Sequence, residues 1–157
     1  MSEQELYESI QKFIKKMYNC FFVETRVGKD CYGYADVFGI RYRNQEKSEI
    51  ETIGVEVKDR KKDVCKSFGQ AKGYSIFCHR VYYATPKTVD NMKTYSEEDK
   101  EIAKYLGIGL IEIRNRSSGY ACIKVLDAPE NSPLVECLDT VLKTKKVNLY
   151  QFCSKKE

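Results

Sequence analysis

The chain contains 157 residues, of which 42% are apolar, and it carries a formal net charge of +4. This length and composition are typical of one globular domain with a single core, and no stretch is long and apolar enough to span a membrane. The N-terminus also lacks the basic, apolar and small-residue order of a signal peptide, so we expect a single cytoplasmic domain over residues 1–157.

The seven cysteines do not form the pattern of a disulfide scaffold or of a zinc site. Their number is odd, they are scattered along the chain, and no CxxC pair occurs. His79 is the only imidazole that could assist a cysteine-based zinc site. We therefore interpret the cysteines as small buried apolar side chains in a reducing compartment.

The first half of the chain has the pattern of one helix followed by three strands. Apolar residues at helical spacing form one stripe within residues 2–17, namely Leu6, Ile10, Phe13, Ile14 and Met17. Ser2 and Glu5 match a capping box at the start of this helix. Runs of β-branched and aromatic residues then predict strands at 21–27, 32–42 and 50–58. A polar, turn-like segment separates the last two strands, so we expect them to form a hairpin.

The second half of the chain alternates helices with strands. The same criteria predict a helix at 64–77, a strand at 80–84, a helix at 96–106, strands at 108–113 and 121–126, and a helix at 133–143. Ser96 and the acidic residues after it suit the start of a helix. The resulting order, α-β-β-β-α-β-α-β-β-α, implies an α/β domain with a mixed sheet flanked by helices.

Three charged residues stand out within the predicted strands. Asp36 lies in the segment YADVFG at 34–39, while Glu56 and Lys58 lie in the segment GVEVK at 54–58. Because alternate residues of a strand point to the same face, Glu56 and Lys58 share one face. Two carboxylates and an ammonium group brought together are suited to metal-assisted cleavage of a phosphodiester. The plainer alternative for Glu56 and Lys58 is an exposed strand that alternates opposite charges.

The chemistry of such a site follows from its residue types. A divalent cation neutralises the phosphate and lowers the pKa of a bound water. Carboxylate oxygens suit Mg²⁺, which needs only one or two of them. Lys58 would orient or deprotonate the attacking water and offset the developing negative charge. Two carboxylates that lie close together without a cation repel each other, so the site should bind metal or contain one carboxyl group with a raised pKa.

These motifs resemble the PD-(D/E)xK, or restriction-endonuclease-like, nucleases. The likeness includes Asp36 followed by the ExK motif of residues 56–58, the segment QAKGY at 70–74, which is similar to a Q-x-x-x-Y element, and the strand RVYYATP at 80–86. It covers most of residues 2–126 and leaves the last helix unmatched. Ala35 stands where the motif's name has proline. The resemblance implies a restriction-endonuclease-like mixed β-sheet core flanked by helices.

The resemblance also implies roles for individual residues. Asp36 and Glu56 would bind Mg²⁺, or Mn²⁺ in its place, with the Val57 carbonyl as a third ligand. Gln70 would bond near the lysine or the phosphate, and Tyr74 would pack beneath it. Because these two residues lie four apart on one helix face they can act together, although ordinary helix surface and core packing would also explain them.

Many members of this family add a glutamate from the first helix. Glu5 and Glu8 are the candidates here, and Glu5 is preferred because it borders the apolar stripe. The alternative for Glu5 is the capping box with Ser2.

Lysines concentrate directly after the ExK motif. Those expected to contact a nucleic-acid backbone are Lys61, Lys62, Lys66 and Lys72. Contacts of this kind position a substrate without reading its sequence. The alternative is a solvated, positively charged helix face.

We therefore expect a Mg²⁺-dependent endonuclease that hydrolyses DNA and, by analogy with small members of the family, acts as a homodimer. One alternative keeps the fold but lacks catalysis and serves as a nucleic-acid-binding module of a repair or defence complex. A second is a Holliday-junction resolvase, which shares the D…ExK site and differs in substrate geometry. A third is a structural α/β protein in which Glu56 and Lys58 form a surface ion pair worth under about 1 kcal/mol.

Overall fold

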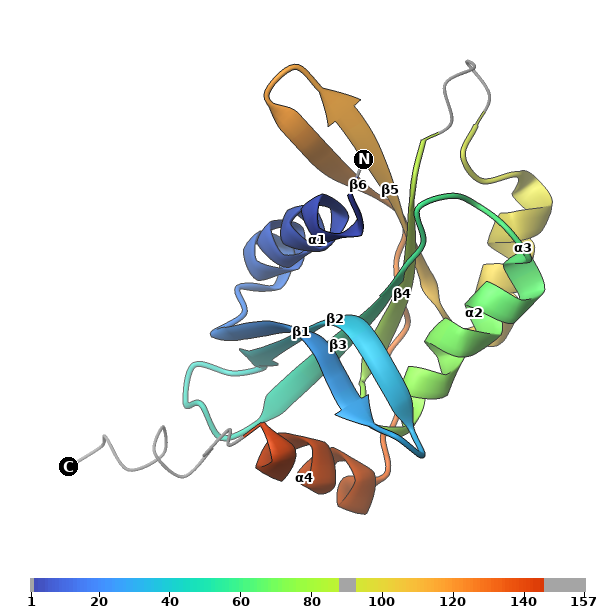
Figure 1. Cartoon of the computed structure of the whole chain (residues 1–157). Helices are drawn as coiled ribbons and strands as arrows, with labels where there is room; N and C mark the ends of the chain where they lie inside the picture. Colours follow the sequence, from blue (N-terminus) through green and yellow to red (C-terminus); the bar gives the residue numbers. More distant parts are fainter. Residues whose placement is uncertain (1, 88–92, 146–157) are drawn as a thin grey trace.

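The computed structural model describes residues 2–87 and 93–145 and contains one six-stranded mixed sheet with helices on both faces (Figure 1). The predicted domain also includes residues 1, 88–92 and 146–157, which lie outside the described residues. The helices are α1 (Glu3–Tyr18), α2 (Val64–Gly73), α3 (Glu97–Leu106) and α4 (Val135–Thr144). The strands are β1 (Phe22–Lys29), β2 (Gly33–Tyr42), β3 (Ile50–Val57), β4 (Arg80–Pro86), β5 (Gly109–Arg116) and β6 (Gly119–Leu126).

The six strands lie side by side in the order in which they occur in the chain. Strands β1, β2 and β3 pair antiparallel, β3, β4 and β5 pair parallel, and β6 returns antiparallel to β5. The two parallel connections contain α2 and α3, as parallel strands require a crossover rather than a tight turn. Because β3, β4 and β5 are parallel, their carboxyl ends meet at one edge of the sheet.

The helices cover the two faces of the sheet unequally. On one face α1 buries Leu6, Ile10 and Ile14 against apolar side chains that include Val55 and Ile111. On the other face α2, α3 and α4 pack on a second apolar cluster, which includes Phe68, Ala71, Ala103, Val141 and Leu142. None of the helices in the described part of the chain has the length and apolar character needed to cross a membrane.

The order of elements predicted from the sequence is confirmed, and so is the capping box of Ser2 and Glu5. The predicted helix at 64–77 is shorter, since α2 ends at Gly73 and a 3₁₀ turn, Tyr74–Ile76, follows it. The interpretation of the cysteines as buried is confirmed for Cys20 and Cys78, whereas Cys122 and Cys137 are only half-buried and Cys153 lies outside the described residues. The interpretation is wrong for two others. Cys31 and Cys65 are exposed, because they lie in a turn and on the outer face of α2.

Candidate active site at the end of strand β3

The candidate site begins where β2 and β3 separate. Their described antiparallel ladder ends with the pair Val37–Val55, so the next pair in this register would be Asp36 with Glu56. At this point the Asp36 side chain replaces a backbone acceptor, because its Oδ2 accepts a hydrogen bond of 2.7 Å from the Val57 N–H. The N–H and C=O of one strand residue point to the same side, so we expect the Val57 carbonyl to face β2 as well.

Glu56 and Lys58 form the centre of the site together with two residues of the following helix and turn. Glu56 Oε1 lies 2.5 Å from Lys58 Nζ, and Glu56 Oε2 accepts a hydrogen bond from the Tyr74 hydroxyl. Lys58 Nζ also donates to Gln70 Oε1 at 3.3 Å. Glu56 is 1% exposed, whereas the Lys58 side chain is 36% exposed. Lys58 thus connects a buried carboxylate to the protein surface.

Helix α1 reaches the Asp36 carboxylate with a tyrosine. The Tyr7 hydroxyl lies 3.2 Å from Asp36 Oδ1 and 2.8 Å from Glu3 Oε1, and it has one proton to donate between them. The structure does not bring the predicted Glu5 to the site, because this exposed residue exchanges capping hydrogen bonds with Ser2. Glu8, the other candidate, is exposed. The acidic side chain of α1 that joins the network of Asp36 is Glu3.

Burial and nearby charge change the protonation equilibria of the site. Burial and the negative charge of Glu56 raise the pKa of Asp36 to about 7, although the Val57 N–H and the Tyr7 hydroxyl oppose the rise. Burial lowers the pKa of Lys58, but its hydrogen bond and ion pair with Glu56 outweigh this and raise the pKa overall. Burial and the Glu56 charge raise the pKa of Tyr74, so its hydroxyl stays protonated and donates.

The oxygen atoms at this point of the sheet are suited to a hard divalent cation. Asp36 and Glu56 supply two carboxylates, and the mutual repulsion that raises the Asp36 pKa is relieved by a cation placed between them. Among residues 2–87 and 93–145, no cluster of three or more His, Cys, Asp or Glu side chains could hold a metal ion. The candidate for a third protein ligand is therefore a neutral oxygen, the Val57 carbonyl. A donor set of this size fits Mg²⁺, which keeps several waters.

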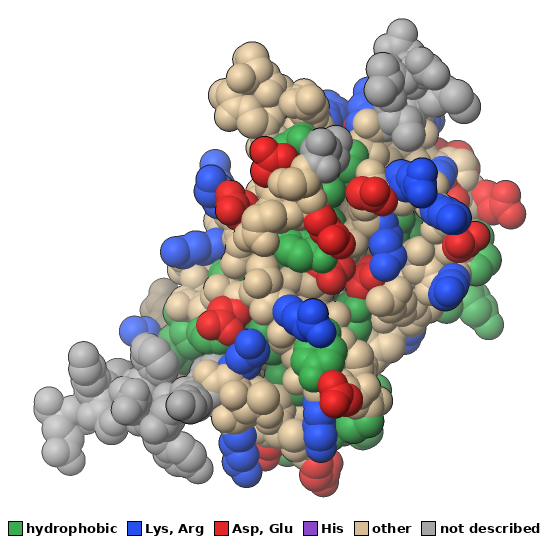
Figure 2. Space-filling model, viewed as in Figure 1, with side chains coloured by type: hydrophobic (Ala, Val, Ile, Leu, Met, Phe, Trp, Pro, Cys, Tyr) green, Lys and Arg blue, Asp and Glu red, His purple; other side chains and the backbone are tan. Residues whose placement is uncertain are grey.

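A basic cleft of about 320 Å³ opens beside Lys58. It is lined by Lys58, Asp59, Arg60, Lys62, Asp63, Lys66, Ser67 and Gln70. Figure 2 shows basic and acidic side chains mixed on the face of the molecule between α1 and α2. Two of the predicted nucleic-acid contacts, Lys62 and Lys66, are exposed on this cleft.

The other two predicted contacts have partners within the protein. Lys61 Nζ forms a 2.7 Å ion pair with Asp99 of the α3 capping box. Lys72 Nζ donates to Asn131 Oδ1 at 3.0 Å and does not line the cleft. The structure therefore does not bring Lys61 and Lys72 into the cleft, because Asp99 holds the ammonium group of Lys61 and Asn131 holds that of Lys72.

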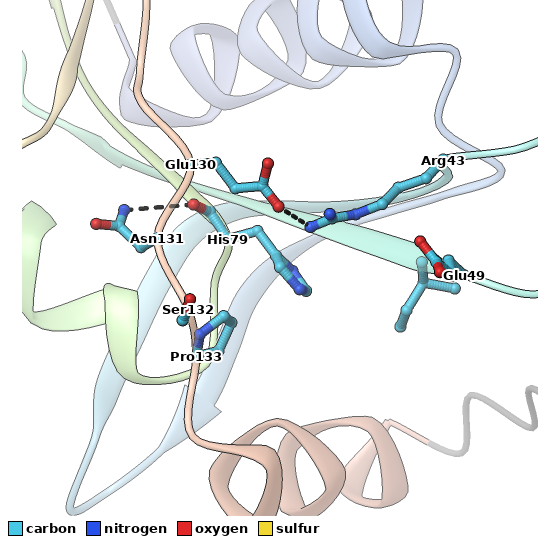
Figure 3. Close-up of a pocket in the computed structure, with 8 residues that line it drawn as sticks. Arg43, Glu49, His79, Glu130, Asn131, Ser132 and Pro133 are labelled. Atoms are coloured by element: carbon cyan, nitrogen blue, oxygen red, sulfur yellow. Dashed lines mark hydrogen bonds and ion pairs between the residues drawn. The ribbon is translucent and has the colours of Figure 1, made fainter.

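A second cavity, of about 410 Å³, lies away from this site between the β2–β3 hairpin and residues 130–133 (Figure 3). Arg43 and Glu130 form an ion pair across it, and His79 lies in its wall. Thr52 N–H donates to His79 Nδ1 at 3.0 Å, so this ring nitrogen is unprotonated and holds the hairpin to the start of β4.

Sequence reasoning did not identify Tyr7 or Glu3 as parts of the site. Tyr7 follows the buried Leu6 and lies three residues before the buried Ile10, so its position beside the apolar stripe was the available signal. Glu3 is exposed at the first turn of α1, and no pattern in the sequence separates it from Glu5 and Glu8.

Comparison with solved structures shows a likeness in fold. A protein of unknown function from Silicibacter pomeroyi, SPO1766, shares 14% sequence identity over 97% of this chain and 88% of its own, with a TM-score of 0.59. SfsA of Pyrococcus furiosus, solved in complex with Ca²⁺, matches with a TM-score of 0.43 at 15% identity, over 80% of this chain and 64% of its own. No protein-family model matches the chain, and no curated protein sequence matches it.

Proposed function

We propose that the protein is a Mg²⁺-dependent endonuclease of the restriction-endonuclease-like type that hydrolyses DNA. One observation carries this proposal: Asp36 of β2, Glu56 of β3 and Lys58, which directly follows β3, lie together at the edge where β3 ends. Their contacts, 2.7 Å from Asp36 to the Val57 N–H and 2.5 Å from Glu56 to Lys58, leave both carboxylates and the ammonium group within one small site.

Each residue has a chemical role in this proposal. Asp36 and Glu56, with the Val57 carbonyl, would hold the cation, which supplies charge neutralisation at the phosphate and a more acidic water. The Lys58 ammonium, whose raised pKa keeps it charged, orients the attacking water and offsets negative charge on the phosphate. Gln70 holds Lys58 through its 3.3 Å hydrogen bond.

Positive charge along the same edge of the sheet supports a nucleic-acid substrate. Arg60, Lys62 and Lys66 line the cleft beside Lys58. A further hollow of about 230 Å³ lies at the ends of β4 and β5 and contains Lys87, Lys93, Lys100 and Arg114 among its lining residues. Since β3, β4 and β5 end at one edge, the two basic regions together offer phosphate contacts along the edge where Glu56 and Lys58 lie.

A plasmid-nicking assay tests the proposal. The wild-type protein should nick supercoiled plasmid in Mg²⁺ or Mn²⁺ but not in EDTA. Asp36→Ala and Lys58→Ala should each slow nicking by at least about 100-fold, the size expected for loss of a group that acts on the reacting atoms. Lys104→Ala is the matched control, because Lys104 is an exposed lysine of α3 outside both basic regions. Wild-type activity that survives both site substitutions would exclude this mechanism.

One observation favours the non-catalytic alternative, a nuclease-fold module that binds nucleic acid within a repair or defence complex. Both Glu56 oxygens already have partners in the protein, Oε1 with Lys58 and Oε2 with Tyr74. This alternative predicts DNA binding without any nicking in Mg²⁺ or Mn²⁺. The resolvase alternative differs in substrate, so it predicts faster cleavage of a four-way junction than of a linear duplex of the same sequence.

A further inference from the structure

An apolar groove lies on the outer face of the two crossover helices. It has a volume of about 400 Å³ and is lined by Cys65, Gly69, Glu101, Ile102, Tyr105 and Leu106, which we call the α2–α3 groove. Tyr105 is 91% exposed, although it belongs to the apolar wall of this groove. Figure 2 shows hydrophobic side chains reaching the surface along the edge of the molecule where Figure 1 places α2 and α3. A contiguous apolar surface of this kind typically marks an interaction site.

The groove combines a projecting side chain with an empty position beside it. Gly69 has no side chain, and a Cβ built there would meet no other atom within 4 Å. Tyr105 stands on the neighbouring helix and lines the same groove as Gly69. A surface that carries both a protruding ring and a space for one can be complementary to itself.

The charges beside the groove are also self-complementary. The first half of α3 exposes Glu97, Glu98 and Glu101, whereas the start of α2 exposes Lys66, preceded by Lys62. Glu101 lies 3.2 Å from Lys104 on its own helix. Because α2 and α3 each connect parallel strands of the sheet, the two helices run in the same direction. A two-fold axis parallel to the helices and centred on the groove would therefore place the acidic start of α3 opposite the basic start of α2 in a second copy.

We propose that the α2–α3 groove binds a second copy of this chain in a two-fold symmetric dimer. Tyr105 of each copy fills the space over Gly69 of the other, and Glu101 of each copy faces Lys66 of the other. This inference goes beyond the proposed function, because it rests on the outer helix face and does not depend on a metal or on catalysis. It shares one residue with the basic cleft, since Lys66 lines that cleft as well.

The size of the face sets the strength of the dimer. The helices α2 and α3 contain 10 residues each. A standard interface uses about 20–30 residues from each partner, so this face lies at the small end of the range. We expect a dissociation constant on the order of micromolar, with Tyr105 as the main energetic contact because buried aromatic residues dominate such interfaces.

Sedimentation equilibrium of the full chain over about 1–500 µM, a range that spans micromolar dissociation constants, tests the proposal. Tyr105→Glu should weaken the dimer at least about tenfold. Gly69→Gln should weaken the dimer similarly, because the new side chain fills the groove. Since glutamine favours a helix more than glycine does, this variant is expected to fold. Val135→Glu is the control, since Val135 is an apolar residue, 68% exposed, outside the groove.

The charge pair gives the most specific readout. Glu101→Lys and Lys66→Glu should each weaken the dimer several-fold, and the double variant should restore most of the wild-type affinity. A wild-type protein that remains monomeric over the whole concentration range would overturn the proposal. A dimer unaffected by Tyr105→Glu and Gly69→Gln would overturn it as well, because the copies would then associate through another surface.

Discussion

The Tyr74 hydroxyl donates a hydrogen bond to Glu56 Oε2, and this contact joins the turn after α2 to the end of β3. Both side chains are buried, with exposed fractions of 2% for Tyr74 and 1% for Glu56. A buried carboxylate is stable only when its oxygens are paired or hydrogen-bonded. The tyrosine and Lys58 together satisfy Glu56, so the geometry of the candidate site depends on a residue that does not itself touch a substrate.

Tyr74→Phe should therefore destabilise the protein by about 1–3 kcal/mol, because the Glu56 oxygen loses its donor in a buried place. Urea unfolding followed by circular dichroism measures this difference. Tyr105→Phe is the matched control, since the exposed Tyr105 should change stability by less than about 0.5 kcal/mol. Equal midpoints for the wild type and Tyr74→Phe would show that the hydroxyl contributes nothing to holding Glu56.

The raised pKa of Asp36 predicts a pH dependence of stability in the absence of metal. Burial and the charge of Glu56 raise this pKa to about 7, well above the value of an aspartate in an unfolded chain. The folded state therefore binds the proton more tightly than the unfolded state does. The contribution of Asp36 to stability is greatest below about pH 4 and is lost as the pH rises through about 7, by a few kcal/mol at most.

Asp36→Asn imitates the protonated carboxyl group and isolates this effect. Its side-chain oxygen can still accept from the Val57 N–H, and its amide can donate to the Tyr7 hydroxyl. In EDTA, thermal unfolding should show little difference between the two proteins near pH 4 and an advantage for Asp36→Asn that grows toward pH 8. A difference that stays constant across this range would show that Asp36 is ionised throughout.

Lys61 and Lys62 are neighbours in the sequence with different surroundings, so they make a matched pair. Lys61→Ala should lower stability by about 1 kcal/mol, since it removes a partly buried 2.7 Å ion pair with Asp99, and should change DNA affinity little. Lys62→Ala should leave stability unchanged and weaken DNA binding. Fluorescence anisotropy with a labelled duplex in EDTA, together with urea unfolding, measures both quantities. A loss of DNA affinity in Lys61→Ala together with a loss of stability in Lys62→Ala would contradict the structure.

The basic hollow at the ends of β4 and β5 allows a second matched pair of lysine variants. Lys100 and Lys104 each lie 3.2 Å from a glutamate three residues earlier on α3, but Lys100 alone lines the hollow. Lys100→Gln should weaken DNA binding and reduce its salt dependence by about one phosphate contact, whereas Lys104→Gln should do neither. Anisotropy titrations at several salt concentrations test this difference, and equal losses for both variants would argue against a DNA path over the hollow.

The order of elements was predictable because the apolar spacing changes clearly from helical to strand periodicity along the chain. The proximity of Glu56 and Lys58 was also predictable, since alternate residues of a strand share a face. The convergence of Asp36 on the same point required that β2 and β3 pair in a register that sets Asp36 opposite Glu56. The sequence predicted the hairpin but not its register, and in the structure the ladder ends at Val37–Val55, one position before Asp36 and Glu56.

Other contacts of the site could not be predicted, because they depend on how helices pack on the sheet. Tyr7 reaches Asp36 only because α1 crosses the sheet at the place where β2 and β3 separate. Lys61 was expected at a nucleic-acid surface, yet its reach to Asp99 depends on the position of α3 beside the loop after β3. Local sequence patterns contain no information on the distance from Tyr7 to Asp36 or on that from Lys61 to Asp99.

The proposed function requires that Asp36 and Glu56 jointly hold a divalent cation. Isothermal titration calorimetry with Mn²⁺ at pH 8, on the wild type, Asp36→Asn and Glu56→Gln, tests it most directly. We predict one site per chain in the wild type and loss of that site in both variants. Each substitution keeps the shape of the side chain but removes its negative charge. A wild type that binds no cation, or variants that bind it as tightly as the wild type does, would contradict the claim.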